Sequence, residues 1–151
     1  MQKIVDLSLY AMRVRLAVVH ARFTGIQGRS LDKNIALKEI ERRFRGVKTS
    51  ICNKVLFIGN GGSNAVCTHM REDYLKCGGI RTSCLNDGSL ITCLSNDFSF
   101  QRVFEKFIEG EAISGDILVA ISSSGKSENV LRGVEAARAR GCGVVTLSGF
   151  K

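Results

Sequence analysis

The apolar positions in the first third of this chain follow a helical spacing. Between Gln2 and about Arg22 they recur at intervals that place them on one face of a helix. A glycine-containing break over 24–30 separates this segment from a second expected helix over 31–47. The side chains expected to face inward from the second helix are Ile35, Leu37, Ile40 and Phe44. The pattern therefore predicts a helical N-terminal region over residues 1–50.

From residue 51 onwards, short apolar runs alternate with segments of helical spacing. The runs 54–58 and 116–121 are apolar at nearly every position, which is typical of strands buried on both faces of a parallel sheet. Weaker strands are expected over 80–85 and 143–147. The expected helices span 63–76, 87–94, 100–109 and 127–140, and the third carries Val103, Phe104 and Phe107 on its apolar face. This alternation predicts an α/β fold, a three-layer sandwich with a mainly parallel sheet of the flavodoxin or Rossmann kind.

The chain length indicates one domain. A chain of 151 residues, 44% of them apolar, is long enough to bury one core. We expect a single domain over 1–151, in which an α/β core over 51–151 follows the helical region. No run approaches the roughly 20 apolar residues that a membrane span requires. Asp6, Arg13 and Arg15 interrupt the N-terminal segment before a signal-peptide core can form.

The spacing and surroundings of the six cysteines predict a reducing compartment. None of them forms a C-x-x-C pair, and several stand inside apolar runs: Cys52, Cys67, Cys77, Cys84, Cys93 and Cys142. We expect buried, reduced thiols rather than a disulfide framework or a cysteine zinc site. Reduced thiols without a membrane span predict a cytoplasmic protein.

The chain has a formal net charge of +8. Its basic residues concentrate over 38–48 and 132–140, where their helical spacing indicates solvated helix faces. A basic field also favours anionic ligands, either sugar phosphates or nucleic acid. The chain has no Trp and no evident run of exposed aromatic residues for stacking on bases, which argues against nucleic acid.

Hydroxyl side chains gather directly after the expected strand 116–121. Four serines stand within six residues, before the next helix: Ser122, Ser123, Ser124 and Ser127. A helix N-terminus presents unpaired N–H groups and a partial positive charge, and small residues let an oxyanion approach closely. The alternative is that these serines only form the turn and cap the helix. The clustering favours a phosphate-binding loop.

A glycine-rich turn, Gly59–Asn60–Gly61–Gly62–Ser63, occupies the equivalent place after the strand 54–58. It matches the dinucleotide fingerprint only in part, because the third glycine position is Asn64, so it is weak support for a nicotinamide cofactor. The alternative is a tight turn whose glycines serve only the backbone.

His69 and Asp73 lie four residues apart on the expected helix that follows this turn, and therefore project from one helix face. That spacing suits half of a zinc site or an acid/base pair. By spacing alone, an ordinary surface His–Asp pair is the more frequent arrangement.

Together these motifs resemble the phosphoheptose isomerases, a branch of the sugar isomerase (SIS) domain family. The resemblance covers about 54–151. It rests on G-N-G-G-S at 59–63 with His69 and an acid four residues later, S-N-D at 95–97, and D-I-L-V-A-I-S-S-S-G-K-S-E-N-V-L at 116–131. Enzymes of this branch interconvert sedoheptulose 7-phosphate and the matching heptose 7-phosphate.

The resemblance implies a role for each matching residue. Asn60, Gly61, Gly62 and Ser63 would contact the sugar phosphate, Asn96 and Asp97 would bind sugar hydroxyls, and Ser122, Ser123, Ser124 and Ser127 would hold the phosphate. His69 and Asp73 would be zinc ligands, with Asp73 also near the reacting carbons. Both are the expected catalytic residues, Asp73 as base or metal ligand and His69 as metal ligand. The resemblance further implies a homotetramer.

The sequence departs from this family in two places. Asp73 stands where the acid is usually Glu, one methylene longer. The family also continues beyond the segment that matches 146–151, through further sheet and a long helix that supplies a Gln and a His to the metal and acid/base set. We therefore expect a chain that lacks two zinc ligands and has impaired activity. The alternative function is a non-catalytic SIS module that binds phosphosugars or a replication-initiator or regulatory partner; the presence of His69, Asp73 and Asp97 favours the enzyme.

Overall fold

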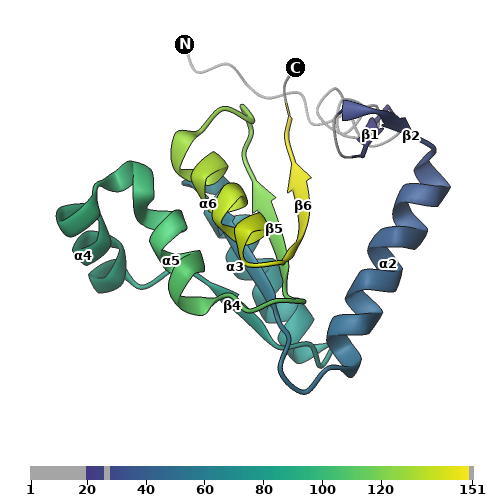
Figure 1. Ribbon diagram of the computed structural model, residues 1–151, viewed down its shortest axis with the longest axis horizontal. Coiled ribbons are helices and arrows are strands. Elements are labelled where there is room, and N and C mark those ends of the chain that lie inside the picture. Colours follow the sequence, from purple (N-terminus) through teal and green to yellow (C-terminus); the bar gives the residue numbers. More distant parts are fainter. Residues whose placement is uncertain (1–19, 26–27, 150–151) are drawn as a thin grey trace, which may run out of the picture. The chain divides into compact units, whose positions relative to one another are not determined.

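The computed structural model describes residues 20–25 and 28–149 (Figure 1). The helix expected from Gln2 lies almost entirely outside the described residues. The chain groups into two compact units, one ending at Ile40 and one beginning at Glu41. The expectation of a single domain over 1–151 stays a prediction.

The first unit contains a short antiparallel ladder and the start of a helix. Strand β1 (Phe23–Thr24) pairs with β2 (Ser30–Leu31), and α2 (Lys33–Thr49) follows. The Asp32 carboxylate accepts hydrogen bonds from the backbone N–H groups of Asn34 and Ile35, at 2.9 and 3.1 Å, which is the expected action of an N-cap. The helix predicted over 31–47 is therefore confirmed, with its start set by this cap.

The prediction of the inward face of α2 is partly wrong. Ile35 and Leu37 are 64% and 45% exposed. Instead, the less exposed positions are Ala36, Ile40, Phe44 and Val47. These positions recur every three or four residues, so they share one helix face; Ile35 projects away from it, and Leu37 lies at its edge.

The second unit is built on a four-stranded parallel sheet. The strands lie in the order β4 (Thr82–Cys84), β3 (Val55–Gly59), β5 (Ile117–Ile121) and β6 (Gly143–Leu147). All three strand pairs are parallel. The sheet confirms the four predicted strands and the predicted α/β class.

Helices cover both faces of this sheet (Figure 1). They are α3 (Gly62–Lys76), α4 (Gly88–Phe98), the short 3-10 helix η2 (Phe100–Arg102), α5 (Val103–Glu111) and α6 (Glu128–Ala139). Each lies within a few residues of its prediction, except that the helix expected over 100–109 is divided into η2 and α5. The described part of the chain contains no helix with the length and apolar character needed to cross a membrane.

Alternate residues of the two central strands belong to two different hydrophobic clusters. Leu56 and Leu118 join the cluster formed with α5 and α6, whereas Val55 and Phe57 join the cluster formed with α3 and the end of α2. Because successive strand residues point to opposite faces, both strands must be apolar throughout. The predicted apolar face of the helix over 100–109 is confirmed, since Val103, Phe104 and Phe107 are at most 6% exposed.

The six cysteines are free thiols, but most are not buried. Only Cys67 is buried, and Cys52, Cys77 and Cys93 are exposed, so the prediction of buried thiols is wrong for these three. Cys52 lies in the middle of the segment that connects α2 to β3, and Cys77 directly follows α3. Cys93 lies on α4, a helix that buries none of its residues.

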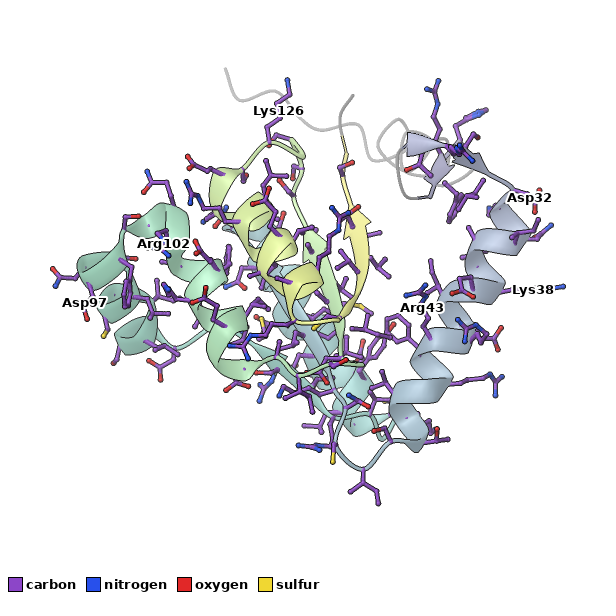
Figure 2. The ribbon with its side chains drawn as sticks, viewed as in Figure 1. Asp32, Lys38, Arg43, Asp97, Arg102 and Lys126 are labelled. Atoms are coloured by element: carbon purple, nitrogen blue, oxygen red, sulfur yellow. The ribbon has the colours of Figure 1, made fainter. Side chains whose placement is uncertain are left out.

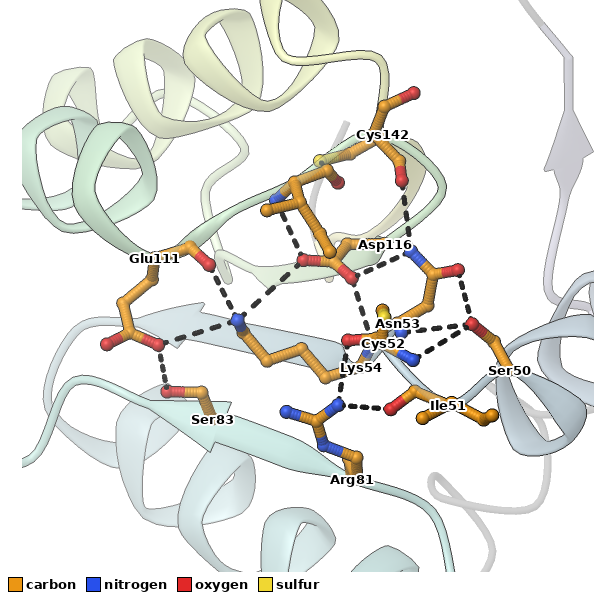
Figure 3. Close-up of polar contacts among 12 residues, drawn as sticks. Ser50, Ile51, Cys52, Asn53, Lys54, Arg81, Ser83, Glu111, Asp116 and Cys142 are labelled. Atoms are coloured by element: carbon orange, nitrogen blue, oxygen red, sulfur yellow. Dashed lines mark hydrogen bonds and ion pairs between the residues drawn. The ribbon is translucent and has the colours of Figure 1, made fainter.

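A buried carboxylate joins the amino ends of β3 and β5 (Figure 3). Asp116 has no exposed surface, and its Oδ1 accepts hydrogen bonds from the Lys54 backbone N–H at 2.9 Å and from Asn53 Nδ2 at 3.3 Å. Its Oδ2 accepts from the Ile113 N–H at 3.0 Å and lies 3.9 Å from Lys54 Nζ. The carboxylate therefore satisfies donors from two segments about 60 residues apart in the sequence.

Removing this carboxylate should destabilise the fold. Asp116→Ala would leave the Lys54 and Ile113 backbone N–H groups without their acceptor, and each buried donor left unsatisfied costs about 1–3 kcal/mol. The Lys54 ammonium would keep its contacts with Glu111. We expect a loss of this order in the free energy of unfolding, measured by urea denaturation. The matched control is Glu135→Ala, which changes an exposed acid on α6 and should shift stability by less than about 0.5 kcal/mol. Equal stabilities for the two variants would contradict the role given to Asp116.

Candidate functional site

The candidate site lies at the carboxyl ends of β3 and β5. These strands are neighbours in the sheet, and Gly59 at the end of β3 is in register with Ile121 at the end of β5. The chain leaves β3 toward β4 on one side and β5 toward β6 on the other, so the strand order reverses between them. In open parallel sheets this reversal point is where ligands bind.

The glycines of the first turn are required by the backbone. A Cβ on Gly59 would lie 3.0 Å from the Ile121 carbonyl oxygen and 3.0 Å from Ser63, so a side chain there would force β5 and α3 apart. Gly61 has a φ of +52°, which L-residues rarely adopt. Gly61 is also the N-cap of α3, and no side chain caps this helix. The first turn of α3 therefore begins without a side-chain acceptor.

A reciprocal amide pair connects the two turns. Asn60 Nδ2 donates to Asn129 Oδ1 at 2.9 Å, and Asn129 Nδ2 donates to Asn60 Oδ1 at 3.0 Å. Asn129 is 3% exposed and lies in the first turn of α6. We did not single out Asn129 from the sequence, although it lies two residues after Ser127, inside the motif 116–131. The pair holds the glycine turn against the start of α6.

The serines of the loop over 122–127, the serine loop, contact one another and do not cap α6. Ser122 is 8% exposed, and its hydroxyl lies 3.3 Å from that of Ser127. Ser127 occupies the N-cap position, yet its side chain makes no capping hydrogen bond. Ser124 Oγ accepts from the Lys126 N–H at 3.2 Å, and Ser123 and Ser124 are exposed. The loop therefore presents hydroxyl groups at the N-terminus of α6, where the N-cap side chain makes no capping hydrogen bond, and an oxyanion favours such a place.

A small cavity of about 150 Å³ opens beside the glycine turn. Its polar wall comes from the turn and the start of α3, and its apolar wall from the end of β4, α4, η2 and α5; the lining residues are Gly59, Asn60, Gly61, Asn64, Leu85, Ile91, Phe100, Val103 and Phe104. Small-molecule pockets usually measure about 300–1,000 Å³. This cavity can therefore enclose only part of a sugar phosphate.

His69 and Asp73 form a solvent-exposed pair on α3. His69 Nε2 lies 3.4 Å from Asp73 Oδ2, and their side chains are 73% and 52% exposed. With a helical rise of 1.5 Å per residue, His69 stands about 9 Å and Asp73 about 15 Å along α3 from Ser63. Neither residue lines the cavity. The pair lies along the same helix as the glycine turn but apart from it.

These two side chains do not form a zinc site by themselves. Zinc takes four ligands, at least three of them from protein in most sites. Within the described residues, no three His, Cys, Asp or Glu side chains are grouped so that they could hold a metal ion. His69 and Asp73 can supply two ligands only.

Asn96 and Asp97 lie on α4, away from both turns. Their side chains are exposed, and Asn96 Nδ2 donates to Asp97 Oδ1 at 3.0 Å. Figure 2 shows Asp97 on the outer side of α4 and Lys126 at the tip of the serine loop. The structure thus brings together the residues of the two turns, whereas it leaves His69, Asp73, Asn96 and Asp97 outside that cluster.

Comparisons with known proteins agree with this geometry. The SIS domain family matches residues 38–149. The phosphoheptose isomerase of Sodalis glossinidius is 40% identical over 101 residues, which cover 64% of this chain and 52% of the relative. The corresponding protein of Klebsiella pneumoniae is 41% identical over the same length. The chain thus spans about half the length of the curated relatives it matches.

Solved structures show the same fold. The phosphoheptose isomerase of Neisseria gonorrhoeae superposes with a TM-score of 0.72 at 28% identity, covering 94% of this chain and 72% of that one. A phosphoheptose isomerase from Francisella tularensis gives a TM-score of 0.75 at 24% identity, covering 99% and 78% of the two chains, and supports the fold alone. On the sheet order, the paired turns and these matches, the chain belongs to the SIS domain family.

Proposed function

We propose that the two turns bind a sugar phosphate and that the protein is an aldose–ketose isomerase of the phosphoheptose type. The observation that carries this proposal is the Asn60–Asn129 pair. It joins the starts of two helices whose N-cap side chains make no capping hydrogen bond, at the reversal point of the sheet. Two positive helix ends with adjacent hydroxyls suit one phosphate dianion. The relatives named phosphoheptose isomerase support the choice of sedoheptulose 7-phosphate as substrate.

The phosphate would sit on the serine loop and the sugar would extend from it. Ser122, Ser123, Ser124 and Ser127 would donate hydroxyl hydrogen bonds to the phosphate oxygens, with the α6 N-terminus behind them. Asn60, Gly61, Gly62 and Ser63 would contact the sugar phosphate from the other turn. Binding at this remote group positions the substrate and contributes no chemistry itself.

The reacting carbons would lie along α3. His69 stands about 9 Å along the helix from Ser63, comparable with the length of an extended seven-carbon sugar phosphate. Asp73, beside His69, would remove the proton from the carbon next to the carbonyl and return it to the neighbouring carbon through an enediol. The cavity holds only part of such a ligand, so the rest would run outside it, along the exposed face of α3.

Zinc would supply Lewis-acid stabilisation of the developing oxyanion when bound. His69 and Asp73 would be this chain's contribution to its ligand set, and further ligands are needed to complete it. Asn96 and Asp97 would bind sugar hydroxyls only if the carboxyl end of α4, which carries them, approached the turns. The homotetramer and the cytoplasmic location stay predictions.

The proposed base predicts a specific loss of turnover. A time course by NMR of the 151-residue chain with sedoheptulose 7-phosphate and zinc should show slow formation of aldose signals, slow because the described residues supply only two metal ligands. Asp73→Ala should reduce this rate by at least about 100-fold, the usual range for a lost acid/base group.

Lys76→Ala, an exposed change on the same helix, is the control and should leave the rate unaltered. Unchanged turnover in Asp73→Ala would contradict the assignment of the base. A folded chain that binds the phosphosugar without converting it would contradict the enzyme and favour a binding module.

The ligand count predicts weak zinc binding. Structural zinc sites bind with about 10–16 kcal/mol, which corresponds to nanomolar or tighter affinity. With His69 and Asp73 alone, isothermal titration calorimetry should give a Kd no tighter than about 1 μM, and His69→Gln should abolish that binding. Nanomolar, stoichiometric binding that depends on His69, or binding that His69→Gln leaves intact, would each contradict the proposed pair.

A further inference from the structure

Asn64 lines the cavity beside the glycine turn, but the proposed function gives it no role. Among the described residues that line the cavity, the only polar side chains are the amides of Asn60 and Asn64. In a mostly apolar pocket, a few fixed polar groups determine which ligand binds and in what orientation. Both the oxygen and the nitrogen of the Asn60 amide are already hydrogen-bonded to Asn129. Asn64 is therefore the polar side chain best placed to select the part of a ligand inside the cavity.

A closed ring of hydrogen bonds holds the Asn64 side chain in place. Asn64 Nδ2 donates to Asn86 Oδ1 at 2.8 Å, and Asn86 Nδ2 donates to Thr68 Oγ1 at 2.6 Å. The Thr68 hydroxyl completes the ring by donating to the Asn64 backbone carbonyl at 2.9 Å. Asn64 and Thr68 belong to α3, whereas Asn86 lies between β4 and α4. The ring therefore fixes the amide through two separate segments of the chain.

The ring leaves part of the Asn64 amide unused. A side-chain amide carries two N–H donors and an oxygen with two lone pairs. Within the described part of the chain, Asn86 takes one N–H, and the Cys84 thiol lies 3.6 Å from the amide oxygen. One donor and one acceptor remain, which suits a hydroxyl group because a hydroxyl both donates and accepts. Since the amide is fixed before a ligand arrives, little side-chain entropy is lost on binding.

The apolar wall of the cavity suits the carbon–hydrogen groups of a sugar. It is formed by side chains between the end of β4 and α5: Leu85, Ile91, Phe100, Val103 and Phe104. A sugar presents C–H groups as well as hydroxyl groups, so this wall can cover the first while an amide binds the second. The volume of about 150 Å³ limits the enclosed part to a few carbons.

We propose that Asn64 is a specificity-determining residue, whose side-chain amide hydrogen-bonds a hydroxyl group of the sugar in the cavity. Asn86 and Thr68 act through Asn64 as positioning residues. This inference rests on the proposed function, because it requires a phosphosugar at the two turns. It adds to that function the group that distinguishes a hydroxyl-bearing sugar phosphate from phosphate alone.

The test compares sedoheptulose 7-phosphate with inorganic phosphate, by NMR titration of the isotope-labelled full chain. Asn64→Leu nearly preserves the side-chain volume and removes the amide. It should weaken binding of sedoheptulose 7-phosphate about 10-fold, the usual effect of losing a hydrogen bond between neutral groups. The Kd of inorganic phosphate should stay unaltered, because this probe requires only the serine loop. A loss confined to the sugar phosphate separates specificity from damage to the fold, which the amide spectrum verifies.

Two further variants separate the outcomes. Asn86→Ala removes two bonds of the ring but keeps Asn64, so it should weaken binding of the sugar phosphate by only about 3-fold. Asn34→Leu makes the matched change at an exposed position of α2 and should alter neither Kd.

Failure of the wild-type chain to bind sedoheptulose 7-phosphate would overturn the proposed function, and this inference with it. If the wild type binds, an Asn64→Leu variant that binds equally well, or that loses affinity for both ligands alike, would overturn the role of Asn64 alone. If Asn64→Leu does not fold, Asn86→Ala decides, and an unchanged Kd for the sugar phosphate would overturn the inference.

Discussion

The pairing of β3 with β5 is the contact on which the rest of the second unit depends. Five residue pairs are in register, from Val55 with Ile117 to Gly59 with Ile121. Polar groups with few other possible hydrogen-bond partners fix the pairing at both ends. They are buried Asp116 at the amino end and the Asn60–Asn129 amide pair at the carboxyl end. A shift of one residue would send every apolar side chain to the wrong face and leave these polar groups without partners.

That fixed register brings two turns that are separate in the sequence together at the candidate site. The glycine turn and the serine loop are about 60 residues apart in the sequence, yet each follows directly from one of the two paired strands. Gly59 permits the close approach of β5 and α3, and Asn129 holds the start of α6 against Asn60. The phosphate binding that we propose here would need no arginine clamp, because backbone N–H groups and hydroxyls would supply the donors.

The elements could be predicted from the sequence because their signals are local. The apolar runs 54–58 and 116–121 are short, and the glycine and serine turns stop them sharply, which favours buried strands over helix segments. What the sequence did not reveal depends on contacts between distant segments. Asn129 and Asp116 look like ordinary polar residues until the fold buries them, and the exposure of Ile35 and of Cys93 follows from which helix face finds a neighbour. The places of Asn96 and Asp97 likewise depend on where α4 lies, which no local pattern specifies.

The most direct test of the shared site is an NMR titration of the isotope-labelled chain with sedoheptulose 7-phosphate, followed through its backbone amide signals. If the two turns form one site, the amides of 59–64 and of 122–128 shift together with a single Kd, and Asn129→Ala weakens binding at both. Shifts confined to one turn, or binding that Asn129→Ala leaves unaltered, would contradict the account.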